Sequence, residues 1–159
     1  MNDFMHRIFG YVELALIFII IICILYLPFL FILKKRGHRP LRQMVCLGFG
    51  CSVFLIIYAA FLFMPIEFQL GNHFSCNLIP LHFLIEEDSM RLFVTEKVPN
   101  IMLFIPLGLF LPLVFKSMRS GKKTMLCALA LTCCIEFIQF FIGRSADIDD
   151  VITNFLGAL

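Results

Sequence analysis

The sequence predicts an all-α fold: a polytopic transmembrane helical bundle with four full spans and the start of a fifth helix. Three observations lead to this prediction, namely an apolar composition, long runs without charge, and the segregation of charge between loops. Of the 159 residues, 61% are hydrophobic and only 15% are charged. So few polar side chains cannot cover a surface that faces water. We therefore expect an integral membrane protein whose single domain occupies residues 1–159.

The first predicted span covers residues 11–33, with Glu13 as its single charged residue. At about 1.5 Å per residue, a helix of this length exceeds the hydrocarbon core of about 30 Å. A cleaved signal peptide is the rival interpretation, but the run is too long and no small-residue cleavage site follows it. Three further spans are expected at residues 44–64, 99–115 and 124–142.

A fifth apolar segment begins near Asp150 and reaches Leu159. As a helix it would be about 15 Å long, which is half of a membrane. Either this segment is a half-helix, or the sequence stops before the span is complete.

The charged residues alternate between two kinds of loop. Residues 34–42 and 116–123 hold nine of the 13 Lys and Arg residues and no acid, so the positive-inside rule places them in the cytoplasm. Residues 65–98 and 143–150 must then face outward, as must the N-terminus. These outer stretches carry eight of the 11 acids, namely Glu67, Glu86, Glu87, Asp88, Glu96, Asp147, Asp149 and Asp150.

The fourth predicted span contains a polar stripe. Glu136 and Gln139 recur with Thr132 and Gly143 at the spacing of one helical face. An ionisable group inside a membrane is costly, so it is a functional candidate by default.

The topology brings other polar residues to the level of this stripe, near the outer interface. The third span begins there, and the fifth segment begins there after a short acidic turn. We therefore predict a binding site formed by Asn100, Glu136, Gln139, Arg144, Asp147, Asp150 and Asn154.

A purely structural interpretation of these residues is also open. Glu136 would then link neighbouring helices through hydrogen bonds, with Asn100 and Asn154 as its partners. Asp147 would cap the fifth helix. Arg144 would only neutralise an aspartate.

The sequence contains no strong motif for a metal, a nucleotide or a nucleic acid. Asp147 and Asp150 are weak candidates for a divalent cation through oxygen ligands, and no other cofactor is expected. The four histidines are scattered, whereas a zinc site needs them clustered. There is no basic stripe for nucleic acid. The oligomeric state is open.

Several segments resemble, in order and spacing, the VanZ-like membrane proteins. The resemblance covers residues 77–159, although Leu81 stands where the family pattern has Phe. Its most specific part runs from E-x-x-Q through R-x-x-D-x-x-D-x-x-x-N-x-x-G. The segments that carry it are "NLIPL" (77–81), "VPNIMLFIPLGLFLPLVF" (98–115), "EFIQ" (136–139) and "GRSADIDDVITNFLGAL" (143–159).

The resemblance implies a small bacterial plasma-membrane protein whose last helix usually continues further. The protein that gives the family its name lowers susceptibility to teicoplanin-type glycopeptide antibiotics. Two classes of function are therefore open. One is an envelope protein that binds a membrane lipid, a lipid-linked cell-wall component or the lipid tail of the antibiotic. The other is an enzyme acting on a lipid-linked phosphate or sugar, with Glu136 as the catalytic general base and Arg144 on the phosphate.

The charge pattern generates a topology prediction. We expect residues 34–42 and 116–123 to be inside, because membranes retain basic loops on the cytoplasmic side. In intact cells, a membrane-impermeant thiol reagent should label Cys76 but not the cysteine of an Arg119→Cys variant. External labelling at position 119 would reverse the orientation.

Overall fold

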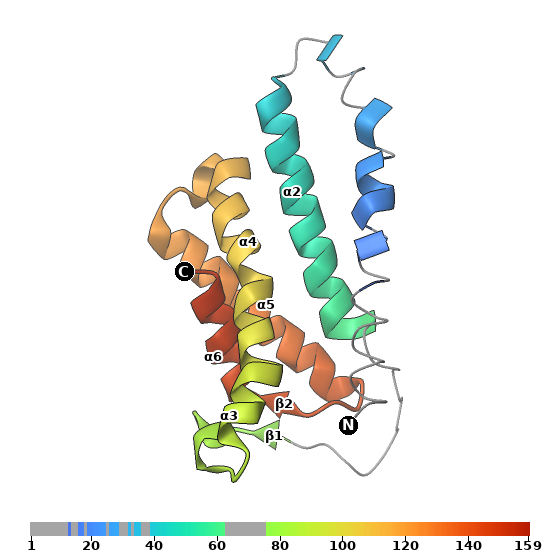
Figure 1. Cartoon of the computed structure of the whole chain (residues 1–159). Helices are drawn as coiled ribbons and strands as arrows, with labels where there is room; N and C mark the ends of the chain where they lie inside the picture. The colour runs from blue at the N-terminus through green and yellow to red at the C-terminus, as the bar shows by residue number, and fades with distance from the viewer. Residues whose placement is uncertain are drawn as a thin grey trace.

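The computed structural model of the chain describes residues 39–62 and 76–159 continuously, together with residues 13, 16–17, 19–24, 26–28, 32 and 34–35 (Figure 1). The described part is almost entirely helical. Its longest helices are α2 (Pro40–Ile57), α4 (Val98–Val114) and α5 (Gly121–Phe141), and a shorter helix, α6, spans Ile148–Gly157.

Short elements extend or connect these helices. A π-helical turn, η1 (Tyr58–Leu62), continues α2. The helix α3 (Ser89–Leu92) and the π-helical turn η3 (Phe93–Lys97) lead without a break into α4. The remaining elements are the 3-10 helices η2 (His82–Ile85) and η4 (Lys116–Met118) and the strands β1 (Cys76–Asn77) and β2 (Ala146–Asp147), which pair in parallel.

Three helical stretches of the described residues are long and apolar enough to cross a membrane, namely Pro40–Phe61, Ser89–Val114 and Gly121–Phe141. They correspond to the second, third and fourth predicted spans. Each begins earlier than its apolar run, most of all the third, because a helix does not have to stop where its side chains become polar. Most of the predicted first span, residues 11–33, lies outside the described residues, so the count of four spans stays a prediction.

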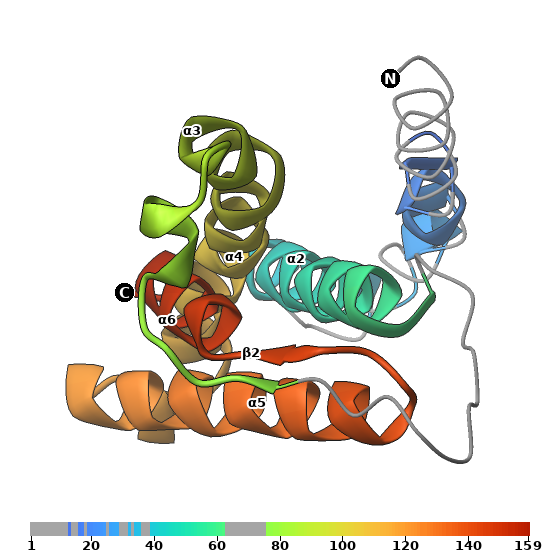
Figure 2. The same cartoon turned by 90° about the horizontal axis from the view of Figure 1, so that it is seen from below.

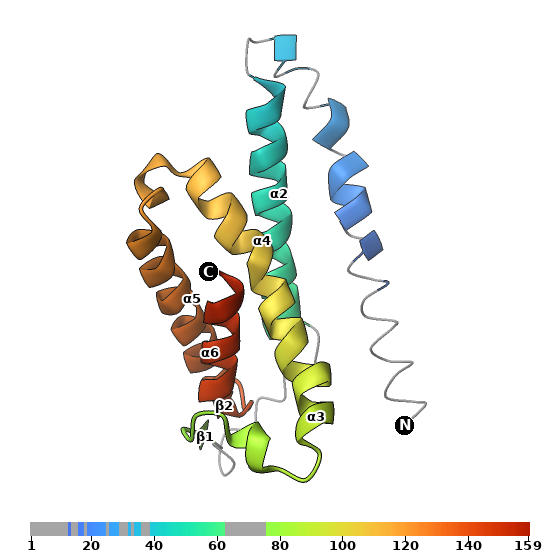
Figure 3. The same ribbon diagram turned by 60° about the vertical axis from the view of Figure 1, so that its left-hand side comes forward.

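The helix α6 packs between α4 and α5, and α4 also packs against α2 (Figures 1 and 3). Viewed from below, the β1–β2 pair runs alongside α5 with α2 on its other side (Figure 2). The start of α2 and the α4–α5 connection lie at one end of the bundle, and the β1–β2 pair lies at the opposite end (Figure 1). The basic and acidic segments are thus at opposite ends, as their alternation in the sequence predicts.

The chain reverses between α5 and α6 through a helix-ending motif. Gly143 adopts a left-handed conformation with φ of 83°, which glycine tolerates without steric cost. The Arg144 N–H donates to the Gln139 carbonyl at 3.0 Å, the bond expected of a Schellman motif. Asp147 then begins α6 as its N-cap, and its carboxylate accepts from the Asp149 N–H at 3.0 Å. The predicted capping role of Asp147 is confirmed.

Two glycines allow α4 and α6 to pack backbone against backbone. A Cβ atom at Gly108 would overlap the carbonyl of Ala158, and one at Gly157 would overlap the carbonyl of Ile101. Small residues at such crossings are what membrane helices use to approach closely.

This contact generates a stability prediction. Gly108→Ala and Gly157→Ala should each lower the free energy of unfolding by about 1–3 kcal/mol, because two backbones must separate to admit the methyl group. Gly50→Ala, in α2, is the control, since its methyl group would meet no atom within 4 Å. It should raise the stability by up to about 1 kcal/mol, because alanine favours a helix more than glycine does. Thermal melting in detergent measures all three, and equal melting of the three variants would contradict the close contact.

Candidate functional site

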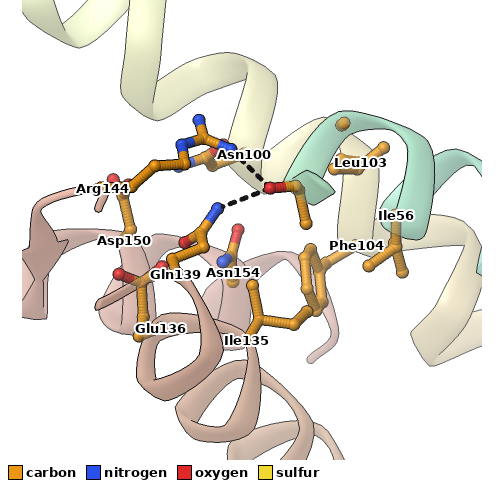
Figure 4. Close-up of a pocket in the computed structure, with 12 residues that line it drawn as sticks. Ile56, Asn100, Leu103, Phe104, Ile135, Glu136, Gln139, Arg144, Asp150 and Asn154 are labelled. Atoms are coloured by element: carbon orange, nitrogen blue, oxygen red, sulfur yellow. Dashed lines mark hydrogen bonds between the residues drawn. The ribbon is translucent and has the colours of Figure 1, made fainter. Parts of the chain in front are cut away.

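A cavity of about 90 Å³ lies where the end of α2 meets α4, α5 and α6 (Figure 4). Six of the seven residues predicted from the sequence line it, namely Asn100, Glu136, Gln139, Arg144, Asp150 and Asn154. The rest of the wall is apolar and consists of Ile56, Ala59, Ala60, Leu103, Phe104 and Ile135. The structure therefore gathers most of the predicted residues around one space.

The α5 wall of the cavity is the predicted polar stripe. Thr132, Glu136 and Gln139 are all buried, because their helical spacing turns them toward α4 and α6 rather than outward. Gly143, the fourth member of the stripe, lies beyond the end of α5.

The carbonyl of Ala60 accepts two side-chain donors on the α2 side of the cavity. The Gln139 amide donates to it at 3.0 Å, and the Arg144 guanidinium also donates to it (Figure 4). Ala60 lies in η1, so both donors reach it from segments distant in the sequence. Arg144 therefore does more than neutralise an aspartate, because its guanidinium also donates to a backbone carbonyl.

Burial lowers the pKa of the Arg144 guanidinium, and the nearby carboxylates of Glu136 and Asp150 raise it. Because a guanidinium is not deprotonated in proteins near neutral pH, Arg144 keeps its charge there. It is the cationic group of the cavity wall.

Lys97 neutralises the aspartates. Its ammonium donates to the carboxylates of Asp147 and Asp150, at 2.8 Å in each case. Only 2% of Lys97 is exposed, so the ion pairs are shielded on the lysine side. They join the start of α4 to the start of α6, next to the cavity.

The sequence prediction missed Lys97. It assigned this residue to an outer loop, because the apolar run begins only at residue 98. The helix instead begins at Ser89, so Lys97 lies within it, less than one turn before Asn100. The available signal was a basic residue directly before a predicted span, in a chain with three aspartates at positions 147, 149 and 150.

Glu136 and Asp147 are linked through the backbone. The Asp147 N–H donates to the Glu136 carboxylate at 3.0 Å, which brings the loop before α6 onto α5. The alternative that Asn100 and Asn154 are the partners of Glu136 is wrong for Asn154, whose amide donates to Thr132 Oγ1 at 3.1 Å. Asn100 lines the cavity without a hydrogen bond to Glu136.

The "NLIPL" segment holds the start of α6 from outside the bundle. The Asn77 amide donates to the Asp147 carboxylate at 3.1 Å, and the Leu81 N–H donates to the Asp149 carboxylate. Leu81 has a left-handed backbone with φ of 60°, which is uncommon for a bulky residue. This conformation aims its N–H at Asp149, which is only 1% exposed.

Asp147 and Asp150, the candidate metal ligands, both use an oxygen to hold the Lys97 ammonium. Within the described ranges, no group of three or more His, Cys, Asp or Glu residues is arranged to hold a metal ion.

The bundle and its cavity define an integral membrane protein with a buried polar cluster at one end of its helices. The chain belongs to the VanZ/LLP1 family, whose profile matches residues 49–159. This match contains all seven predicted site residues and Lys97. No curated protein and no solved structure matches the chain.

The Lys97 contacts generate a prediction for stability. Lys97→Met leaves two carboxylates without their cation. Removing one partner of a fully buried pair costs about 3–5 kcal/mol, and we expect about 2–3 kcal/mol here. The lower figure reflects the partial exposure of the carboxylates, which is 22% for Asp147 and 29% for Asp150. Thermal melting of the purified protein is the measurement.

Two further variants make this test specific. Adding Asp147→Asn and Asp150→Asn to Lys97→Met should recover at least half of the loss, because no charge is then left unpaired. Arg91→Met breaks the exposed pair with Asp88 and should cost less than about 1 kcal/mol. If the triple variant melts at a lower temperature than Lys97→Met, then Lys97 does not stabilise the protein through these ion pairs.

Proposed function

We propose that this VanZ-like protein binds the polar end of a membrane lipid or lipid-linked cell-wall component at the outer leaflet of the bacterial plasma membrane. This binding would lower susceptibility to teicoplanin-type lipidated glycopeptide antibiotics. The observation that carries the proposal is the cavity itself. Charged and amide side chains from α4, α5, α6 and the α5–α6 connection converge on one space in an otherwise apolar bundle. Such costly groups inside a membrane protein commonly mark a binding site or pathway.

The outer-leaflet location follows from the charge pattern. We propose four full spans and the half-length helix α6, with the N-terminus outside and the basic loops 34–42 and 116–123 in the cytoplasm. The start of α2 and the α4–α5 connection, which carry basic residues, lie at the end of the bundle opposite the β1–β2 pair. This arrangement supports the proposed orientation. The cavity lies toward the β1–β2 end, so it would face the outer leaflet.

The size of the cavity favours a small polar group. A volume of about 90 Å³ is small beside the roughly 300–1,000 Å³ of pockets that enclose drug-sized ligands. This space is too small for a glycopeptide or an oligosaccharide. A single polar group of an amphiphile fits the volume, while its apolar part remains in the bilayer.

The segment beside the site supports contact with the bilayer surface. Most apolar side chains of residues 78–94 are exposed, with Leu78, Ile85 and Met90 more than 70% exposed, whereas Phe83 is buried. Acidic residues are interspersed in the same segment. Mixed segments of this kind are stable where headgroups meet acyl chains.

The geometry favours binding over the alternative, an enzyme acting on a lipid-linked phosphate or sugar. In that alternative Glu136 would be the general base, and Asp147 and Asp150 would hold a divalent cation. One Glu136 oxygen already accepts a backbone N–H, and Lys97 already bridges the two aspartates. Chelation of divalent cations would abolish the activity of such an enzyme and leave a binding protein unaffected.

The proposal predicts a drug-specific phenotype that depends on Glu136. Expression in a susceptible host should raise the inhibitory concentration of teicoplanin and leave that of vancomycin, which lacks the lipid, unchanged. Glu136→Gln should return the teicoplanin value to that of the host. Glutamine keeps an oxygen for the Asp147 N–H, so the melting temperature and membrane level should stay near normal.

Glu87→Gln is the matched control, because it makes the same chemical change at an exposed position of the outer segment. This variant should keep the teicoplanin inhibitory concentration and the melting temperature of the parent. Equal sensitivity to both drugs with and without the protein would remove the resistance role. A melting loss in Glu136→Gln that tracks its loss of resistance would assign Glu136 to helix packing instead.

A further inference from the structure

We infer that the basic end of the bundle binds anionic phospholipid headgroups of the leaflet it faces, which is the cytoplasmic leaflet in the proposed orientation. The basic surface at this end consists of exposed Lys and Arg residues from two segments. They are Lys34, Lys35, Arg39 and Arg42 at the start of α2, and Lys116, Arg119, Lys122 and Lys123 between α4 and the first turn of α5. Both segments lie opposite the β1–β2 end, where the cavity is (Figure 1). This lipid is therefore distinct from the ligand proposed for the cavity.

The chain itself supplies no counter-charge to the basic surface. Within the part of the chain that the structure describes, every recorded ion pair involves other residues. In the sequence, no acid lies between Glu13 and Glu67 or between Glu96 and Glu136. The acidic loops are at the other end of α5, whose 21 residues span about 30 Å. Exposed charges further apart than the Debye length of about 8 Å are largely screened, so these acids cannot offset the basic surface.

The α4–α5 connection holds its cations on a hydrogen-bonded backbone. The Met118 N–H donates to the Phe115 carbonyl at 3.0 Å, and the Thr124 hydroxyl donates to the Met118 carbonyl. The Arg119 N–H donates to the Lys116 carbonyl at 3.4 Å. The cations of this segment are thus close together before any ligand binds, which reduces the ordering that binding requires. Like charges held in this way repel each other, and an anionic ligand relieves the repulsion.

Apolar side chains next to the basic surface favour a lipid as the partner. Leu41, Met44 and Leu126 are each at least 60% exposed. Leu41 and Met44 flank Arg42, and Leu126 follows Lys123 by three residues, so each lies within one helical turn of a cation. An apolar band bordered by a basic one matches the acyl chains and anionic headgroups of a bilayer. RNA, a soluble polyanion, would have to approach these cations along a membrane surface that is itself negative.

The test uses the full-length protein purified in dodecyl maltoside. Phosphatidylglycerol, phosphatidylcholine and glycerol phosphate are added separately, and thermal melting is followed. A ligand that binds only the folded protein raises its melting temperature with concentration. We expect saturable stabilisation by phosphatidylglycerol. The apparent affinity for phosphatidylcholine should be at least about tenfold weaker, because its headgroup has no net negative charge to meet the cations. Glycerol phosphate has the charge but no acyl chains, and it should not stabilise the protein at the same concentrations.

Variants assign the effect to the basic surface. A cation near an anionic bilayer contributes about fivefold in affinity, so Arg119→Gln should weaken phosphatidylglycerol binding about fivefold. The double variant Lys122→Gln/Lys123→Gln should weaken it about tenfold or more. Both variants keep at least two cations in the connection and change exposed side chains, so their melting temperatures without added lipid should equal that of the parent.

Two control variants accompany them. Lys122→Arg/Lys123→Arg keeps both charges and should bind phosphatidylglycerol as tightly as the parent. Arg91→Gln removes an exposed cation from the segment at the opposite end and should also leave the affinity unchanged.

The outcomes decide between a lipid and other partners. Equal stabilisation by the two lipids would show that headgroup charge is not recognised and would overturn the inference. An unchanged phosphatidylglycerol affinity in the double Gln variant would also overturn it, since the lipid would then act elsewhere. Stabilisation by glycerol phosphate equal to that by phosphatidylglycerol would assign the surface to a free phosphate. Displacement of phosphatidylglycerol by a short RNA at comparable concentration would assign it to nucleic acid.

Discussion

The ion pairs of Lys97 with Asp147 and Asp150 determine how the other parts of the site are placed. They join the start of α4 to the start of α6 through a lysine that is almost fully buried. With Asp147 held there, its backbone N–H reaches Glu136 on α5 and its carboxylate reaches Asn77. The two carboxylates are partly buried, so removing the cation between them would leave them without charge compensation. Four segments distant in sequence meet as a result.

The short helix α6 is held in two different ways along its length. Its first turn is fixed by charge and capping, through Asp147 and the contacts of Asp149. Its last turn is fixed by shape, because Gly157 and Gly108 let the backbones of α6 and α4 touch. A ten-residue helix is marginal in isolation, so tertiary contacts of both kinds hold α6, and with it Asn154, at the cavity wall.

The polar cluster could be predicted in part because its members obey local rules. Thr132, Glu136 and Gln139 share a helical face by spacing alone, and the structure buries all three. Asp147 precedes a helix as capping residues do. The roles of Lys97 and Arg144 could not be predicted in this way. Their partners, Asp150 and Ala60, lie 53 and 84 positions away.

By itself, the sequence determined that the chain is a helical membrane protein, where three described apolar helices lie, and which polar residues share a level. These properties follow from composition and from periodicity along one segment, which are local quantities. Only the tertiary structure decided which donor meets which acceptor. It placed Lys97 inside a helix, turned Gln139 and Arg144 onto one carbonyl, and left the Asn154 Oδ1 atom buried without a hydrogen-bond partner in the described part of the chain. Those outcomes depend on the relative positions of helices, because a long flexible side chain takes whichever partner the packing brings within reach.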